Sequence, residues 1–155
     1  EHEKIERFAG YSQVPVINAL TDLYHPCQLL ADVQTFIEHR GEIAGRTVAW
    51  IGDGNNMCHS WINAARQFDF HLSIAAPDGY LPDNGILTAA GRHASLTSDP
   101  YAAVDGADLN QPFDAGFIDD WARGRNYPPV PSRAGLTNNG NVRRGSRGAS
   151  ASWKS

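Results

Sequence analysis

Residues 47–61 read TVAWIGDGNNMCHSW, the stretch of the chain that says most about its fold. Residues 47–51 are apolar and mostly β-favouring without polar alternation, which predicts a strand covered on both faces. Two glycines follow, and Met57, Trp61 and other apolar residues up to Phe68 recur at helical spacing. The stretch therefore predicts a strand, a tight turn and a helix.

Downstream, residues 71–77 predict a second strand, which completes a βαβ unit with parallel strands and a right-handed crossover. The pattern continues with a helix at 86–93, a strand at 95–98 and a short helix at 101–104. This alternation predicts the α/β class, with a parallel sheet and flanking helices.

Upstream, residues 3–9 carry apolar side chains at helical spacing behind acidic ones, and they predict a short amphipathic helix. Residues 14–18 predict a short buried strand, in which Pro15 suits an edge or a strand start. Residues 27–40 predict a one-faced helix with Pro26 in its first turn.

The last 45 residues differ from the rest in composition. Residues 1–110 hold 14 Asp and Glu against 6 Lys and Arg, whereas residues 111–155 hold 3 against 7. Residues 111–155 are also poor in Leu, Ile, Val and Phe, rich in Gly, Pro, Ser and Arg, and without periodicity. We expect a disordered or aberrant tail there.

Composition also excludes several classes of protein. Cys27 and Cys58 have no Cys-x-x-Cys spacing, so neither a disulfide framework nor a zinc knuckle is indicated, and a reducing cytoplasmic location is expected. No apolar run approaches the roughly 20 residues that span a bilayer, and we expect no membrane partner. The acidic residues 1–110 and the lack of a recognisable module in the basic tail predict no nucleic-acid partner.

Gly52-Asp-Gly54 begins like a dinucleotide-binding turn, but Met57 stands where the third glycine of that fingerprint belongs. One reading is that the glycines only make a tight turn. The other is a polar ligand at the carboxyl end of the strand, where open α/β sheets usually bind. Asn55 and Asn56 are candidates to hold it, because an amide both donates and accepts hydrogen bonds.

The second candidate is His25-Pro-Cys-Gln28, at the start of the predicted helix 27–40. Free N–H groups at a helix start favour an anionic ligand, and an imidazole and an amide together suit a small group with one carbonyl and one NH2. The alternative is that His25 only caps or packs against the helix. No metal site is expected, because His59, His71, His93 and the cysteines show no metal-ligand spacing. These histidines are interpreted as structural or surface residues, and Cys58 beside His59 is not expected to act as a nucleophile, because neighbours on a helix point apart.

Two stretches together resemble ornithine carbamoyltransferase, in the aspartate/ornithine carbamoyltransferase superfamily. They are VPVINALTDLYHPCQLLADVQTFIEHRG at residues 14–41 and WIGDGNNMCHSW at residues 50–61, and the resemblance covers about residues 1–109. Aspartate carbamoyltransferases share the His-Pro-x-Gln motif but lack the Asn-Asn pair. The resemblance therefore favours an amino acid with a cationic side chain as the acceptor.

The resemblance implies roles for individual residues. His25 and Gln28 would contact the carbamoyl group of carbamoyl phosphate, and His25 would stabilise the oxyanion that develops when an amine attacks. Pro26 and Cys27 would complete the motif by shaping and packing it, and Asn56, with Asn55 beside it, would bind the amino-acid end of L-ornithine. Catalysis would need no metal, no cofactor and no covalent enzyme intermediate.

The resemblance also implies two α/β domains joined by the helix that carries Gln28, and a homotrimer. In these terms residues 1–42 are the end of the carbamoyl-phosphate domain with the inter-domain helix, residues 43–110 begin the ornithine domain, and residues 111–155 are unlike the family. The family's phosphate-binding Ser-Thr-Arg-Thr loop and its later Ser-Met-Gly and His-Cys-Leu-Pro motifs do not occur in the chain. We expect that the reading frame or splice is lost near Leu109 or Asn110.

The predicted function is that of an incomplete ornithine carbamoyltransferase of arginine metabolism, with a partial carbamoyltransferase fold. The whole enzyme would convert carbamoyl phosphate and L-ornithine into L-citrulline and phosphate, and the isolated chain is expected to be inactive. Two alternatives remain: a carbamoyltransferase for another amine such as putrescine, and a non-catalytic chain that docks on a full-length relative.

Overall fold

The computed structural model describes residues 1–112, 136–137 and 141–142. Its helices are α1 (His2–Tyr11), α2 (Pro26–Arg40), α3 (Asn56–Gln67), α4 (Asn84–Ala90), the 3-10 helix η1 (Gly91–His93) and α5 (Pro100–Val104). Its strands are β1 (Thr47–Ile51), β2 (His71–Ala75), β3 (Ala94–Thr97), β4 (Leu109–Pro112), β5 (Leu136–Thr137) and β6 (Asn141–Val142). The predicted disordered or aberrant tail lies outside the described residues, apart from the end of β4 and the small antiparallel pair β5–β6.

Four strands form a parallel sheet in the order β3-β2-β1-β4. Four of the five β1 residues, Val48 to Ile51, are buried, which confirms the prediction of a strand covered on both faces. The chain leaves β1 towards β2 and β3 and returns to the other side of β1 with β4. Open α/β sheets bind ligands at such a reversal of strand order, beyond the carboxyl ends of the strands.

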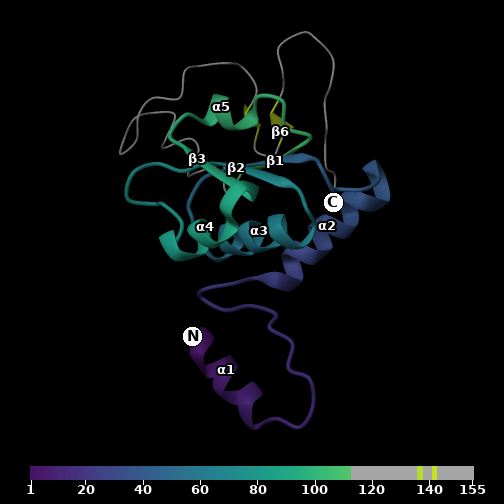
Figure 1. Cartoon of the computed structure of the whole chain (residues 1–155), viewed down its shortest axis with the longest axis vertical. Helices are drawn as coiled ribbons and strands as arrows, with labels where there is room; N and C mark the ends of the chain where they lie inside the picture. The colour runs from purple at the N-terminus through teal and green to yellow at the C-terminus, as the bar shows by residue number, and fades with distance from the viewer. Residues whose placement is uncertain (113–135, 138–140, 143–155) are drawn as a thin grey trace.

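Helices cover both faces of this sheet (Figure 1). α2, α3 and α4 lie on one side, and α5 lies on the other. The apolar face of α3 supplies Cys58, Trp61, Ile62 and Ala65 to the core, at the spacing expected for one helical stripe. Trp61 is fully buried against Phe70, with the two rings edge to face. The predicted α/β class, with a parallel sheet and flanking helices, is confirmed.

The predicted strand at residues 14–18 is wrong. These residues form no strand, and Val14 and Ile17 are 70% and 78% exposed instead of buried. A strand needs a neighbour that shares its backbone hydrogen bonds, and Pro15 has no N–H to donate. Within the described part of the chain, no strand lies beside this segment.

Other predicted boundaries shift by a few residues. α1 and α2 begin one residue before the predicted helices 3–9 and 27–40, and the second predicted strand ends at Ala75 instead of residue 77. The helix predicted at 86–93 divides into α4 and η1 at Gly91, whose φ of 55° departs from helical geometry. None of the described helices is long and apolar enough to cross a membrane.

Candidate functional site

The turn after β1 is shaped by two glycines with different tasks. Gly52 has a φ of 140°, which a side chain would disfavour. At Gly54 a Cβ atom would overlap the backbone of Leu81 and Pro82, and the Gly54 N–H donates to the carbonyl of Tyr80 at 2.7 Å. Gly54 is therefore needed for the close approach of the loop after β2.

The two asparagines that follow are placed differently. Asn55 is the N-cap of α3, and its Oδ1 accepts from the N–H groups of Met57 and Cys58 at 3.0 and 3.2 Å. Asn56 is the first residue of α3, and its Nδ2 donates to the carbonyl of Thr21 at 2.7 Å. The Asn55 oxygen is thus occupied by the helix, whereas the Asn56 amide faces the segment that leads to His25.

His25 is the N-cap residue immediately before α2, and it lies against the start of α3. Its backbone N–H donates to Ser60 Oγ at 2.8 Å, and the same hydroxyl donates to the carbonyl of Asn56 at 2.9 Å. The ring nitrogen Nδ1 of His25 is buried and has no hydrogen-bond partner among the described residues. The structure therefore joins the two predicted motifs through one serine, and it leaves one buried polar atom of His25 without a partner among the described residues.

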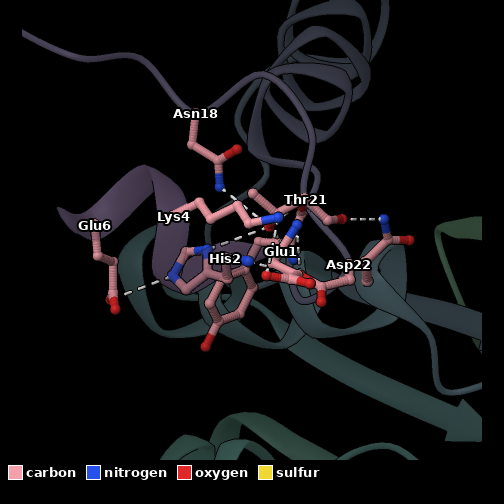
Figure 2. A network of polar contacts seen from close by, with 9 residues as sticks. Glu1, His2, Lys4, Glu6, Asn18, Thr21 and Asp22 are labelled. Atoms are coloured by element: carbon pink, nitrogen blue, oxygen red, sulfur yellow. Dashed lines mark hydrogen bonds and ion pairs between the residues drawn. The ribbon is translucent and has the colours of Figure 1, made fainter. Parts of the chain in front are cut away.

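The segment before His25 is held from its other side by the N-terminus of the chain (Figure 2). The Thr21 hydroxyl lies 3.2 Å from His2 Nδ1 and accepts from Asn18 Nδ2 at 3.5 Å. The backbone N–H of His2 donates to Asp22 Oδ1 at 2.8 Å. Thr21 is buried, so α1 and α3 approach this short segment from two sides.

The remaining residues of the His25–Gln28 motif lie in the first turn of α2, which is partly open to solvent. Cys27 is exposed, and its thiol lies 3.4 Å from the carbonyl of Asn18. Gln28 is also exposed and donates from Nε2 to Asp32 Oδ1 at 3.0 Å. Burial raises the pKa of Asp32, against the opposing effects of the Gln28 hydrogen bond and the nearby His25.

Sequence reasoning missed Asp32 as a neighbour of this motif. Its spacing from Gln28, one helical turn, was the available signal. It also missed that His59 contacts both the segment before His25 and the loop after β2. The spacing of Asn56, His59 and Ser60 at i, i+3 and i+4 places them on one face of a helix, but no sequence signal identifies what that face binds.

Cys58 is fully buried, and burial, with Asp53 adding to it, raises the pKa of its thiol. A neutral buried thiol is a poor nucleophile, in agreement with the prediction for this residue. His71 Nδ1 lies 3.1 Å from the carbonyl of Arg92, and His93 Nδ1 lies 3.8 Å from Asp69. In the described part of the chain, no three His, Cys, Asp or Glu side chains gather as a metal site would require.

A cavity of about 280 Å³ lies between α2 and α3. Its walls include Leu29, Leu30 and Phe68, and neither His25 nor Asn56 lines it. The polar residues of its walls are Asn18, Tyr24, Ser60, Asn63 and Gln67, but none of the described charged side chains lines it to neutralise a charged substrate. We therefore place the candidate site at the joined ends of α2 and α3 and not in this cavity.

Two family models match successive parts of the chain. Residues 1–38 match the model of the aspartate/ornithine carbamoyltransferase carbamoyl-P binding domain, and residues 44–109 match that of the Asp/Orn binding domain. Over 108 residues the chain is 67% identical to the ornithine carbamoyltransferase of Nitrosococcus oceani, which covers 70% of this chain and 36% of that protein. The chain thus spans about a third of the length of that relative.

Solved structures give a consistent result. The ornithine carbamoyltransferase of Burkholderia thailandensis superimposes with a TM-score of 0.72 and 48% identity, over 77% of this chain and 42% of that one. The catalytic subunit of M. jannaschii aspartate transcarbamoylase superimposes with a TM-score of 0.58 and 26% identity, over 70% and 38% of the two chains. Both share the fold, and the first is more similar in sequence.

Proposed function

Because the chain belongs to the aspartate/ornithine carbamoyltransferase family, we propose that it is part of an ornithine carbamoyltransferase. The reaction is the transfer of the carbamoyl group from carbamoyl phosphate to L-ornithine, which yields L-citrulline and phosphate. The observation that carries the proposal is the junction of the two motifs, in which Ser60 bonds to His25 and Asn56. This junction supports the proposal, because it brings the motif proposed to bind the carbamoyl group next to the motif proposed to bind the amino acid.

On the carbamoyl side, His25 and Gln28 act at the start of α2. An imidazole N–H directed at the carbonyl oxygen stabilises the charge that develops there when the amine attacks, and it costs no reorganisation if the ring is already held. The unpartnered, buried Nδ1 of His25 supports a ring that is kept ready for a ligand. Gln28 adds an amide that matches the carbamoyl NH2 and oxygen.

On the acceptor side, Asn56 binds the amino-acid end of ornithine. One N–H of its amide already donates to Thr21, which fixes the orientation of the side chain and leaves Oδ1 and the second N–H for a ligand. An ammonium and a carboxylate on one carbon suit such a donor and acceptor pair. Putrescine has no carboxylate, so this arrangement favours ornithine over that alternative acceptor.

The proposal concerns a larger assembly than these residues. The first turns of α2 and α3, which form the candidate site, offer imidazole and amide groups but no Arg or Lys to neutralise a phosphate dianion. The arginines of these two helices, Arg40 and Arg66, lie in their last turns. We propose that the phosphate-binding loop, the rest of the ornithine pocket and the trimeric contacts come from sequence beyond residues 1–109. The 155-residue chain alone is then expected to form no citrulline.

A chimera tests the proposal. Residues 1–109 replace the matching segment of the Nitrosococcus oceani enzyme, and citrulline is measured with carbamoyl phosphate and ornithine or putrescine. We expect turnover with ornithine, and a decrease in kcat on the order of 10²- to 10³-fold for His25→Ala, as for the loss of an oxyanion donor. A folded chimera without turnover, or one that prefers putrescine, contradicts the proposal.

Gln28 has a matched control on the same helix. Gln34 is also exposed and donates from Nε2 to Glu38 Oε1 at 2.8 Å, the same type of i to i+4 contact that Gln28 makes with Asp32. Gln28→Ala and Gln34→Ala therefore each remove one hydrogen bond of the same kind, but only Gln28 lies in the candidate site. We expect Gln28→Ala to raise the KM for carbamoyl phosphate and Gln34→Ala to leave it unchanged.

The non-catalytic alternative makes a different prediction. If the chain docks on a full-length relative, the 155-residue protein mixed with the intact Nitrosococcus oceani enzyme elutes with it in size-exclusion chromatography. We expect separate elution. Co-elution together with an inactive chimera would favour the docking function over the catalytic one.

A further inference from the structure

One face of the first turns of α3 binds the backbone just before α2. Asn56 donates to the Thr21 carbonyl at 2.7 Å, His59 Nδ1 lies 3.1 Å from the Leu23 carbonyl, and Ser60 accepts from the His25 N–H at 2.8 Å. We call these three side chains the α3 clamp. They hold alternate residues of the segment, so its path is fixed at three points.

His59 differs from the other two members because both of its ring nitrogens are used. The Leu23 carbonyl can only accept, so Nδ1 carries the proton, and Nε2 accepts from the backbone N–H of Asp83 at 2.9 Å. His59 as a residue is 8% exposed. His59 therefore ties α3 to two segments, one before α2 and one after β2.

Both of these segments lead to the candidate site. Leu23 lies two residues before His25, whose N–H is held by the residue next to His59. Asp83 follows Leu81 and Pro82, the loop residues that pack against Gly54. Gly54 in turn stands immediately before Asn55 and Asn56 in the sequence. The His59 imidazole thus holds two segments: the one that leads to His25 on the proposed carbamoyl-binding side, and the loop that packs against the turn before Asn56 on the proposed acceptor side.

We propose that His59 is a positioning residue for carbamoyl transfer, which holds the Leu23 peptide so that His25 keeps a fixed place relative to Asn56. This inference rests on the proposed function. His59 touches neither substrate and acts through His25. A displacement of about 1 Å in a reacting group is enough to lower a rate by on the order of 100-fold, so one lost backbone contact has a measurable effect.

Two amide variants separate the two contacts of the ring. An asparagine amide nitrogen reaches about the position of Nδ1 and keeps the bond to Leu23, whereas a glutamine amide oxygen reaches about that of Nε2 and keeps the bond to Asp83. In the chimera we expect His59→Asn to retain most of kcat. We expect His59→Gln and His59→Phe to lower kcat on the order of ten- to 100-fold with little change in the KM for ornithine.

The tautomer supplies an independent measurement on the 155-residue chain. Nitrogen chemical shifts of the imidazole are expected to show a neutral ring with the proton on Nδ1. A ring whose only proton is on Nε2 overturns the inference, because Nδ1 then has no proton to donate to the Leu23 carbonyl. If His59→Asn keeps most of kcat and His59→Gln does not, a role of His59 in stability alone cannot explain the difference.

The outcomes distinguish the two proposals. A chimera with His59 intact that makes no citrulline refutes the proposed function and, with it, the role of His59. An active chimera in which the Asn, Gln and Phe variants share one kcat refutes the positioning role and leaves the function intact. Melting temperatures are compared for all variants, and where His59→Phe does not fold, the comparison of the Asn and Gln variants decides.

Discussion

Large apolar side chains are exposed in the first 20 residues of the chain and mostly buried in residues 43–109. In the second region the sheet and α3 bury Trp61, Phe70 and Leu72 completely or nearly so. In the first region α1 buries no residue, and five large apolar side chains are exposed: Phe8, Tyr11, Val14, Ile17 and Leu20. Residues 43–109 thus contain a core of their own, whereas the first 20 residues gain little hydrophobic stabilisation from this chain.

Polar contacts hold the first region in place. Figure 2 shows them around His2 and Thr21, together with ion pairs such as Lys4 with Glu1 at 3.2 Å. Exposed ion pairs contribute about 0–1 kcal/mol each. Most of the buried core of the described chain belongs to residues 43–109, with Leu29, Val33 and Phe36 of α2 packed into it. Substitutions in the two regions should therefore differ sharply in their effects.

The largest effect is expected at the centre of the core. Trp61→Ala removes a fully buried side chain and leaves a cavity beside Phe70, which should lower the free energy of unfolding by about 3–5 kcal/mol. Urea unfolding followed by circular dichroism measures this value. Leu30→Ala, at a half-exposed position of α2, is the control and should stay within about 0.5 kcal/mol of the original chain. An equal decrease in the free energy of unfolding for both variants would contradict the burial of Trp61 in a core that Leu30 does not share.

The next effect is expected at the turn after β1. Gly54→Ala places a methyl group against the backbone of Leu81 and Pro82, which cannot move without displacing the loop, and should cost about 1–3 kcal/mol. The control is Gly10→Ala in α1, where the methyl group meets no atom within 4 Å. Because alanine favours helix, this variant should be neutral or stabilising by up to about 1 kcal/mol. A tolerated Gly54→Ala would contradict the close approach of the two segments.

A smaller loss is expected at the cap of α3. Asn55→Ala removes the side-chain acceptor of two backbone N–H groups and should cost about 1 kcal/mol. Asn63→Ala, an exposed position within the same helix, supplies the control and should change stability by less than about 0.5 kcal/mol. If Asn55 were free for a ligand instead of capping the helix, the two variants would have the same stability.

The smallest effect is expected in the first region. Val14→Ser and Ile17→Ser replace exposed apolar side chains, so we expect changes within about 0.5 kcal/mol in the urea midpoint analysis. The same substitutions should reduce aggregation, measured by light scattering, because they shrink an exposed apolar surface. A loss comparable to that of Trp61→Ala would mean that these side chains are buried in solution.

Sequence patterns predicted the parts of the fold whose signals are local. β1, the turn and α3 follow from a run of apolar residues, two glycines and helical spacing within residues 47–68. The strand order was not predicted, because the position of β4 beside β1 depends on pairing between distant residues. The strand predicted at residues 14–18 is wrong for the same reason: an apolar run favours a strand, but a partner must exist to pair with it.

The candidate site shows the same division. The motifs at His25 and at Asn56 were identified from residue types, but the contacts that join them were not. His59 contacts Leu23 and Asp83 across 36 and 24 residues of sequence, and neither contact leaves a periodic trace. The substrate roles of His25, Pro26, Cys27, Gln28, Asn55 and Asn56 remain predictions, and the kinetic experiments test those of His25 and Gln28 directly.

The two cysteines differ in a way that offers a practical handle on this site. Cys58 is fully buried with a raised pKa, whereas Cys27 is exposed in the first turn of α2, two residues from His25. A thiol-reactive fluorophore should therefore attach at Cys27 alone while the chain is folded, because the thiolate is the reactive form. Its emission would change when a molecule binds beside His25. Cys27 is therefore a natural site for attaching one fluorescent label next to the candidate site.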